Sequence, residues 1–171
     1  MSLVARFLAA VVSPDPGDLA DCYAPRAVIE MPFAVPGLMP DRLEISREDL
    51  RARFRAGTAV RRYTEVLNPR IHECADGTTV VLEYDVKGVM LATDAPFVLR
   101  FVMVMTLADG LIVHTRDYTD PIAGARALGP ASRTCLPPCG SVTQCVRPLG
   151  RGMAVAWINP WAFGGSDELG A

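Results

Sequence analysis

Residues 97–129 read FVLRFVMVMTLADGLIVHTRDYTDPIAGARALG, and this stretch decides the fold. Its pattern predicts two long strands on either side of an Asp109-Gly110 turn, followed by a short helix. One carboxylate, that of Asp117, falls late on the second strand, on a face that otherwise carries apolar residues or a threonine, Thr115. A carboxylate turned into apolar surroundings is costly unless it is paired or protonated. We therefore take Asp117 as the leading functional residue.

The composition is that of one domain with a substantial core. The chain has 171 residues, half of them hydrophobic, and a net charge of -2 from 17 basic and 19 acidic side chains. A chain of this length buries roughly two-thirds of its unfolded surface. No basic stripe runs through the sequence, which argues against nucleic acid and favours a small organic ligand or another protein as partner. The apolar run near the N-terminus is too short to span a bilayer, so we expect a cytoplasmic protein with no membrane partner.

The predicted elements run from helices to a sheet. Helical spacing of apolar residues predicts a helix over 3–12, Asp18 is expected to cap a short second helix reaching Tyr23, and a near capping box at 46–49 starts a helix to about Gly57. Strands are predicted over residues 27–33, 62–74, 78–90, 97–107 and 111–118. Long antiparallel strands curl around shorter helices, and Gly88 is expected to mark a bulge or bend.

Both faces of the strand over 97–107 are mostly apolar. One face carries Phe97, Leu99, Phe101, Met103, Met105 and Leu107, and the other carries Val98, Arg100, Val102, Val104 and Thr106. Helices cover only the concave side of a curled sheet, which leaves the other face for a partner subunit. We therefore expect a homodimer that packs through the convex face of the sheet.

This order of elements, with a first strand ending in Ile-Glu-Met-Pro and a closing run DGLIVHTRDYTDP at residues 109–121, resembles the SnoaL-like branch of the nuclear-transport-factor-2-like superfamily, which includes ketosteroid isomerase. The likeness covers about residues 2–129. It implies an α+β fold, a cone-shaped barrel in which a curved antiparallel sheet wraps around about three N-terminal helices and encloses a hydrophobic pocket. Members are often dimeric and cofactor-free, and they include cyclases, isomerases, epoxide hydrolases, dehydratases and binding proteins, so the fold does not decide the function.

The resemblance to ketosteroid isomerase does not extend to its catalytic residues. Its general base falls on Met31, its oxyanion tyrosine on Phe7 and its protonated aspartic acid near Met103, and all three residues here are apolar. Isomerisation by that apparatus is excluded, and we expect these side chains to line the pocket. The resemblance to SnoaL-type cyclases and phenazine-biosynthesis A/B-type proteins instead implies a working acid at Asp117.

Two registers of the last hairpin give Asp117 opposite roles. With a three-residue loop at 108–110, Asp117 lies opposite Phe101 and diagonal to Met103 on the pocket face, where burial should raise its pKa toward the range of a general acid or base. With a two-residue loop the register slips by one, and Asp117 lies beside Arg100 and Val102 on the outer face as an interface ion pair. The resemblance favours the pocket register.

The remaining polar candidates are less specific. Tyr84 is either a pocket hydroxyl or a core tyrosine with its hydroxyl at the rim. Glu30 is expected to point away from the pocket. His72 and His114 have no carboxylate or cysteine at ligand spacing, so neither a metal site nor another cofactor is expected. The arginines between residues 47 and 62 could attract an anionic ligand, but an exposed helix face is the usual explanation.

Residues 130–171 follow a different pattern. They have no helical or strand period, are rich in Pro and Gly, and hold three of the five cysteines without zinc-site spacing. We divide the chain into a SnoaL-like domain over 1–129 and an irregular tail over 130–171. The tail is disordered, covers a dimer edge through Trp157 and Trp161, or comes from a shifted reading frame.

Three functions fit the sequence. The first is a cofactor-free isomerase, cyclase or hydrolase in which Asp117 moves a proton. The second is a binding protein for a small apolar organic ligand, which the apolar residues at the isomerase positions favour. The third is a dimerisation module that works through the outer face. An open pocket with a buried Asp117 would favour the enzyme, and a filled cone would favour the module.

Overall fold

The computed structural model describes residues 1–34, 40–120 and 122–124. Its elements follow the predicted order of helices and strands, with one strand that was not predicted. In chain order they are α1 (Leu3–Val11), the 3-10 helix η1 (Pro16–Cys22), β1 (Tyr23–Glu30), β2 (Arg42–Ser46), α2 (Arg47–Gly57), β3 (Arg61–Glu73), β4 (Thr79–Met90), β5 (Pro96–Ala108) and β6 (Leu111–Asp117).

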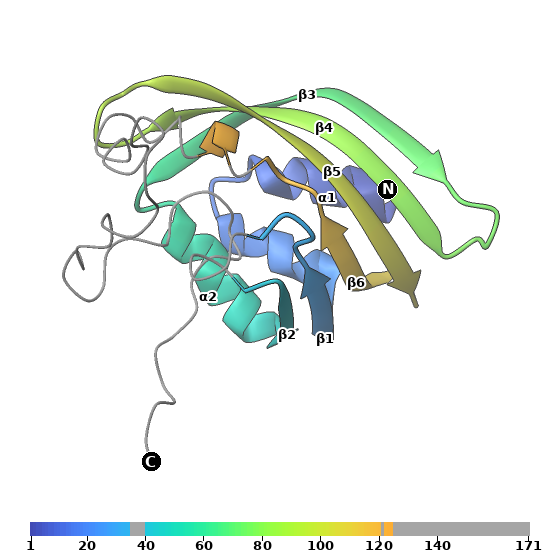
Figure 1. Cartoon of the computed structure of the whole chain (residues 1–171). Helices are drawn as coiled ribbons and strands as arrows, with labels where there is room; N and C mark the ends of the chain where they lie inside the picture. The colour runs from blue at the N-terminus through green and yellow to red at the C-terminus, as the bar shows by residue number, and fades with distance from the viewer. Residues whose placement is uncertain (35–39, 121, 125–171) are drawn as a thin grey trace, which may run out of the picture.

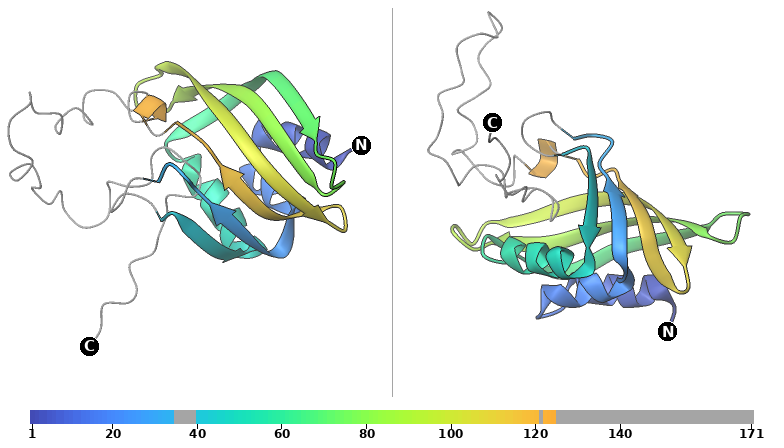
Figure 2. Two further views of the ribbon diagram at one scale, coloured as in Figure 1. Left: turned by 45° about the vertical axis from the view of Figure 1, so that its right-hand side comes forward. Right: turned by 90° about the horizontal axis from the view of Figure 1, so that it is seen from below.

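The strands form one curved sheet that does not close on itself. Their order is β2-β1-β6-β5-β4-β3, and the long strands β3 to β5 arch over the helices, which lie on the concave side (Figure 1). Two further views show the same two layers (Figure 2). The predicted α+β fold with a curved sheet around the N-terminal helices is confirmed. The sheet is not wholly antiparallel, however, because β1 runs parallel to β6.

The first two strands differ from the prediction. β1 begins at Tyr23 rather than at residue 27 and ends at Glu30. It tolerates Pro25 because β2 pairs with it only from Arg26 onward and its pairing with β6 shifts register just there. β2 was missed because it is five residues long and alternates charged with apolar side chains after a run of prolines.

One of the two predicted helix caps differs in the structure. Asp15, not Asp18, caps η1, because its Oδ1 accepts from the Gly17 amide at 2.8 Å. Asp18 instead accepts from the Ser13 hydroxyl at 2.6 Å. At the start of α2, the predicted cap is confirmed, since the Ser46 hydroxyl accepts from an amide one turn into the helix.

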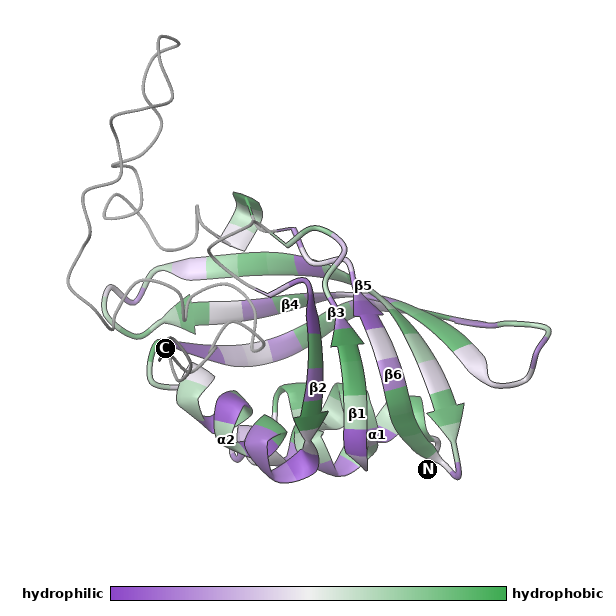
Figure 3. Ribbon diagram, turned by 60° about the horizontal axis from the view of Figure 1, so that its bottom comes forward, coloured by the Kyte–Doolittle hydropathy of each residue, from purple (hydrophilic) through white to green (hydrophobic). Residues whose placement is uncertain are grey.

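The core lies between the helices and the concave face of the sheet. Hydrophilic and hydrophobic residues alternate along much of β4 (Figure 3). In β5, which is mostly hydrophobic, it is burial that alternates, so that Phe101 is buried while Val102 is exposed. Gly88 allows the sheet to bend, because a Cβ there would lie 2.4 Å from Phe97 and 2.6 Å from the Arg62 carbonyl. The bulge itself lies opposite, in β3, where Thr64 is an extra residue between two pairs.

The sequence also predicted that the chain has no membrane partner and that an irregular tail follows residue 129. In the part of the chain that the structure describes, no helix has both the length and the apolar character needed to cross a membrane. The predicted boundary at residue 129 and the tail that follows lie outside the described residues.

Candidate functional site

The hairpin of β5 and β6 turns through a two-residue loop. Asp109 and Gly110 form it, with positive φ angles of 52° and 72°, as a type I′ turn requires. Ala108 therefore pairs with Leu111, and the predicted three-residue loop is wrong. By alternation alone, this loop would place Asp117 on the outer face.

A β-bulge in β6 reverses that outcome. Val113 is an extra residue, because the pairing skips it before Thr106 meets His114. The shift of one residue turns the rest of β6 over, and Asp117 lies opposite Met103 on the concave face. The pocket face was thus predicted correctly, but the neighbour across the strand is Met103 rather than Phe101.

A cavity of about 380 Å³ opens between the helices and this face of the sheet. Five of the predicted site residues are in its wall: Phe7, Tyr84, Phe101, Met103 and Asp117. Met31 and Thr115 are buried elsewhere, contrary to the expectation. Met31 follows the end of β1, where its amide donates to the Asp41 carbonyl, and Thr115 lies one inward-facing position nearer the hairpin turn than Asp117.

Asp117 is almost completely buried, with 3% of its surface exposed. Its Oδ1 accepts from the Thr119 amide at 2.9 Å and from the Thr119 hydroxyl. Both donors favour the charged carboxylate and fix its orientation, while burial opposes the charge. The prediction missed Thr119, although Asp-x-Thr is the sequence of a turn in which an aspartate accepts from the amide two residues on.

Tyr84 presents a neutral phenol to the same cavity. Its ring stacks on Phe101 with centroids 5.0 Å apart and meets Phe7 edge-on at 6.2 Å. Its hydroxyl donates to the Met103 sulfur at 3.5 Å. A thioether is a weak acceptor, so a ligand oxygen would take over this donor readily. Burial, and secondly the charge of Asp117, raise the pKa of Tyr84 well above its ordinary value.

Tyr23 is a second phenol in the wall, and the prediction treated it only as the end of a helix. It is fully buried at the start of β1. Burial raises the pKa of Tyr23 well above its ordinary value, the charge of Asp117 adds to this, and the Thr115 hydroxyl opposes it. Both phenols are therefore protonated at neutral pH, and each can act as a hydrogen-bond donor.

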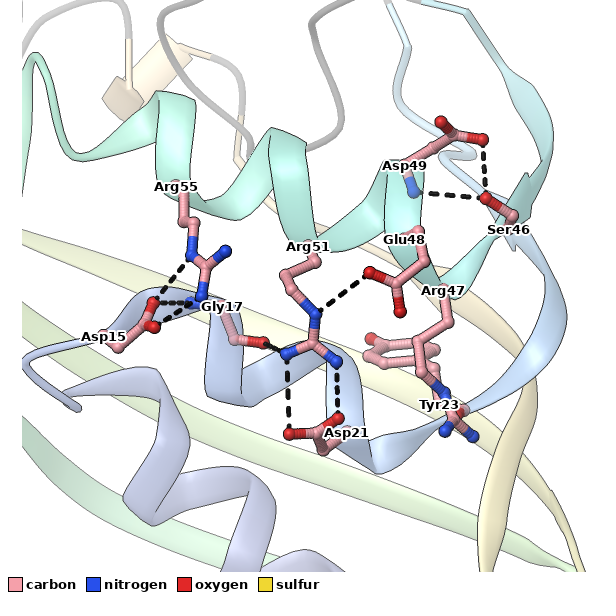
Figure 4. A network of polar contacts seen from close by, with 10 residues as sticks. All are labelled: Asp15, Gly17, Asp21, Tyr23, Ser46, Arg47, Glu48, Asp49, Arg51 and Arg55. Atoms are coloured by element: carbon pink, nitrogen blue, oxygen red, sulfur yellow. Dashed lines mark hydrogen bonds and ion pairs between the residues drawn. The ribbon is translucent and has the colours of Figure 1, made fainter.

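Arginines on one face of α2 hold the floor of the cavity in place (Figure 4). Arg47 donates from Nε to the Tyr23 carbonyl at 2.8 Å, which anchors the start of β1. Arg51 and Arg55, one and two turns further along, bind η1. Their carboxylate partners, each at 2.6 Å, are Asp21 and Asp15. Arg55 remains exposed, as expected of this helix face, whereas the side chain of Arg51 is largely covered by η1.

The opposite face of the sheet carries a separate polar cluster. Glu30 lies between His114 at 3.4 Å, Arg116 at 3.3 Å and Arg42 at 2.8 Å, and it points away from the cavity as predicted. Among the described residues, no group of three or more His, Cys, Asp or Glu side chains is placed to hold a metal ion.

The sequence model of the SnoaL-like domain matches residues 4–115. The chain belongs to the SnoaL-like domain family. An uncharacterised PhzA/B-like protein of Pseudomonas aeruginosa is 30% identical to this SnoaL-like chain over 111 residues, which cover 64% of the chain and 75% of that protein. The predicted family membership is thus confirmed.

Solved structures share the fold of this SnoaL-like protein. One, described as "Putative Isomerase from Bacillus subtilis", is 25% identical with a TM-score of 0.67 and matches 74% of this chain and 90% of that one. Another, described as a "putative polyketide cyclase" of Pseudomonas putida KT2440, is 17% identical with a TM-score of 0.59 over 74% of this chain and 98% of that one. The second likeness establishes the fold alone.

Proposed function

We propose that this SnoaL-like protein is a cofactor-independent enzyme of the isomerase, cyclase or hydrolase type, with Asp117 as its acid and base. One observation carries the proposal: a buried carboxylate stands in the wall of a mostly apolar cavity, held by Thr119. A carboxylate in such surroundings has a structural cost that a proton-transfer role would explain. The name of the solved structure that is 25% identical, "Putative Isomerase", supports the same reaction class.

The geometry fits proton transfer beside a carbonyl group. Asp117 takes a proton from the carbon next to the carbonyl, so that a C–H bond breaks, an O–H bond forms on the carboxylate and the electron pair moves to the carbonyl oxygen as an enolate. The Tyr84 hydroxyl leaves the Met103 sulfur and donates to that oxygen as negative charge develops. Asp117 then returns the proton to another carbon. In a ring closure, the enolate carbon attacks a second carbonyl of the same substrate, and the oxygen of that carbonyl takes the proton back from Asp117.

A binding protein without chemistry is the second candidate. Phe7 and Met103, which stand at positions where ketosteroid isomerase carries polar groups, are both in the cavity wall and are apolar. The presence of a cavity favours the enzyme and the binding protein over the dimerisation module, for which we expected a filled cone.

The first prediction tests catalysis by deuterium exchange. A panel of ketones and β-ketoesters is incubated with the protein in deuterated buffer, and loss of the α-proton signal is followed by NMR. Asp117→Asn keeps the size of the side chain but cannot accept the proton, so the exchange rate should fall by roughly a hundredfold. Asp85→Asn, a matched change on the outer face of β4, should leave the rate unchanged. An undiminished exchange rate in Asp117→Asn would contradict the catalytic role of Asp117 and favour the binding-protein function.

We also propose that the protein works as a homodimer through the convex face of the sheet. Val98 and Val102 support this, because they are 50% and 39% exposed on the face of the sheet opposite to α1, η1 and α2.

A further inference from the structure

We propose that the substrate is a ketone with an apolar body and that it enters the cavity carbonyl first. The inference rests on the proposed function, because it names a substrate class and an orientation for the same cavity. Two features carry the argument. The exposure of the wall rises from one end of the cavity to the other, and Asp117 and Tyr84 both lie at the buried end.

The cavity has a mouth on one side of the molecule. Phe7 of α1 is 1% exposed, whereas Pro14, shortly after the helix, is exposed. Tyr84 of β4 is 5% exposed, whereas Leu91, directly after the strand, is 43% exposed. α2 ends on the same side of the molecule as α1 (Figure 1), and its exposed C-cap, Thr58, also lines the cavity. A ligand therefore enters past the ends of these three elements.

The groups that can meet a carbonyl lie at the opposite, closed end. Asp117 and Met103 are opposed across β6 and β5, where Cβ atoms are about 5 Å apart, and the Tyr84 hydroxyl donates to the Met103 sulfur at 3.5 Å. A carbonyl oxygen is a better acceptor than this sulfur. When it takes the hydrogen bond from Tyr84, the carbon next to the carbonyl comes close to Asp117. The carbonyl is therefore the inner end of the substrate.

The wall between the two ends is mostly apolar. It contains Val86 of β4, Val11 of α1 and Phe54 of α2, and all three are buried. A charged group in the substrate body would lose its hydration against these side chains. The volume of about 380 Å³ is at the small end of ligand pockets, which range over about 300–1,000 Å³. These walls fit a compact hydrocarbon body.

Arg61 does not call for an anionic group in that body. It is the first residue of β3, lines the cavity and is 4% exposed. The sequence placed it in a series expected to be an exposed helix face, whereas it turns inward beyond the end of α2. Its Nε donates to the Tyr63 hydroxyl at 3.0 Å, and its guanidinium carbon lies 5.3 Å from the centre of the Tyr63 ring. The guanidinium is thus engaged within the protein before a ligand binds.

Gly57 leaves room for the substrate body. It is the last residue of α2, is buried and lines the cavity. A Cβ at this position would lie 3.6 Å from the Arg61 Nη2, which is an ordinary contact. A methyl group therefore fits, whereas a leucine side chain would take up part of the cavity. We regard Gly57 as a specificity-determining position for the length of the body.

The second prediction is that affinity rises with the length of the substrate body. In the series 2-butanone, 2-hexanone and 2-octanone, each methylene that leaves water should tighten binding about fourfold. Dissociation constants are measured by NMR titration of the wild-type protein. In 7-oxooctanoate a carboxylate replaces the outer methyl group of 2-octanone, and this probe should bind at least tenfold more weakly than 2-octanone.

The orientation is tested in the complex with 2-octanone. The methyl group next to the carbonyl should show a nuclear Overhauser effect to the ε-methyl group of Met103, and the outer methyl group should show one to Val86. The reverse pattern would overturn the orientation. Equal affinity along the series, binding of no member of it, or tighter binding of 7-oxooctanoate would overturn the substrate class.

A variant at Gly57 tests the body without touching the chemistry. Gly57→Leu should bind 2-butanone as the wild type does and 2-octanone at least tenfold more weakly, whereas the matched control Gly57→Ala should bind both as the wild type does. If Gly57→Leu does not fold, the wild-type series and the contacts of 2-octanone still decide. Asp117→Asn should keep the dependence on length, so failure of the exchange test and failure of this inference are told apart.

Discussion

Thr119 helps to fix the orientation of Asp117. Thr119 gives it two hydrogen bonds, one from the backbone and one from the hydroxyl, and both end on the same carboxylate oxygen. Since these bonds form to the charged state, Thr119 offsets part of the cost of burying the carboxylate. We therefore regard Thr119 as a positioning residue that acts through Asp117.

The third prediction is that Thr119→Val raises the pKa of Asp117 above that of the wild-type protein. Loss of the hydroxyl donor removes stabilisation of the charged form, and a hydrogen bond to a charged group is worth about 1.5–3 kcal/mol, or roughly one pKa unit or more. The pKa is measured from the carboxyl-carbon resonance of Asp117. Thr119→Ser keeps the donor and should titrate as wild type. If Asp117 titrates identically in Thr119→Val and in the wild type, Thr119 does not stabilise its charged form.

At the scale of elements, the floor of the cavity is an ion-paired contact between α2 and η1. Arg55 binds Asp15 through Nε at 3.0 Å and through Nη2 at 2.6 Å. The hydrogen bond from Arg55 and then that from the Gly17 amide hold the pKa of Asp15 at about 2, below its ordinary value of 3.8. The stabilisation is therefore complete above the ordinary value and is lost as the pH falls through about 2.

The fourth prediction follows from the lowered pKa of Asp15, which makes the ion pair stabilising only where this carboxylate is charged. Asp15→Asn keeps the cap on η1 but loses the charge, so it should melt at a lower temperature than the wild type at pH 6. The difference should shrink steadily below pH 4 and vanish only below pH 2, where most of the wild-type carboxylate is also protonated. Melting is followed by circular dichroism. Asp94→Asn, in an exposed turn, is the control and should show no such trend. A difference in melting temperature that does not change with pH would contradict the ion-pair explanation.

At the scale of the whole molecule, the two faces of the curved sheet differ, and we propose that one binds the ligand and the other a second copy of the chain. The helices lie on the concave side of the sheet (Figure 2). The cavity opens between them and the sheet, whereas Val98 and Val102, on either side of Arg100 in β5, are exposed on the other face. Exposed apolar residues in the middle of a long strand are typical of an interface.

The fifth prediction is that the protein sediments as a dimer at micromolar concentration. Val102→Asp would bury an unpaired charge in the interface and should give monomers. Val102→Thr changes the shape of the side chain little, adds no charge and should remain dimeric. A wild-type protein that sediments only as a monomer would show that the convex face has another purpose.

The sequence by itself determined the family, the order of the main elements and the extent of the long strands. These follow from local signals: the alternation of apolar residues along β4, the long apolar run of β5, the Asp109-Gly110 turn and the cap at Ser46. Each signal acts within a few residues along the chain, so it can be read without knowing what lies opposite.

Only the tertiary structure decided which way the functional side chains point. The bulge at Val113 settles the face of Asp117, and it depends on how two strands fit together rather than on the residues of either one. Tyr23 and Arg61 were missed for a related reason. They come from the ends of elements far apart in the sequence, and the curl of the sheet over α2 and η1 is what buries them in one cavity.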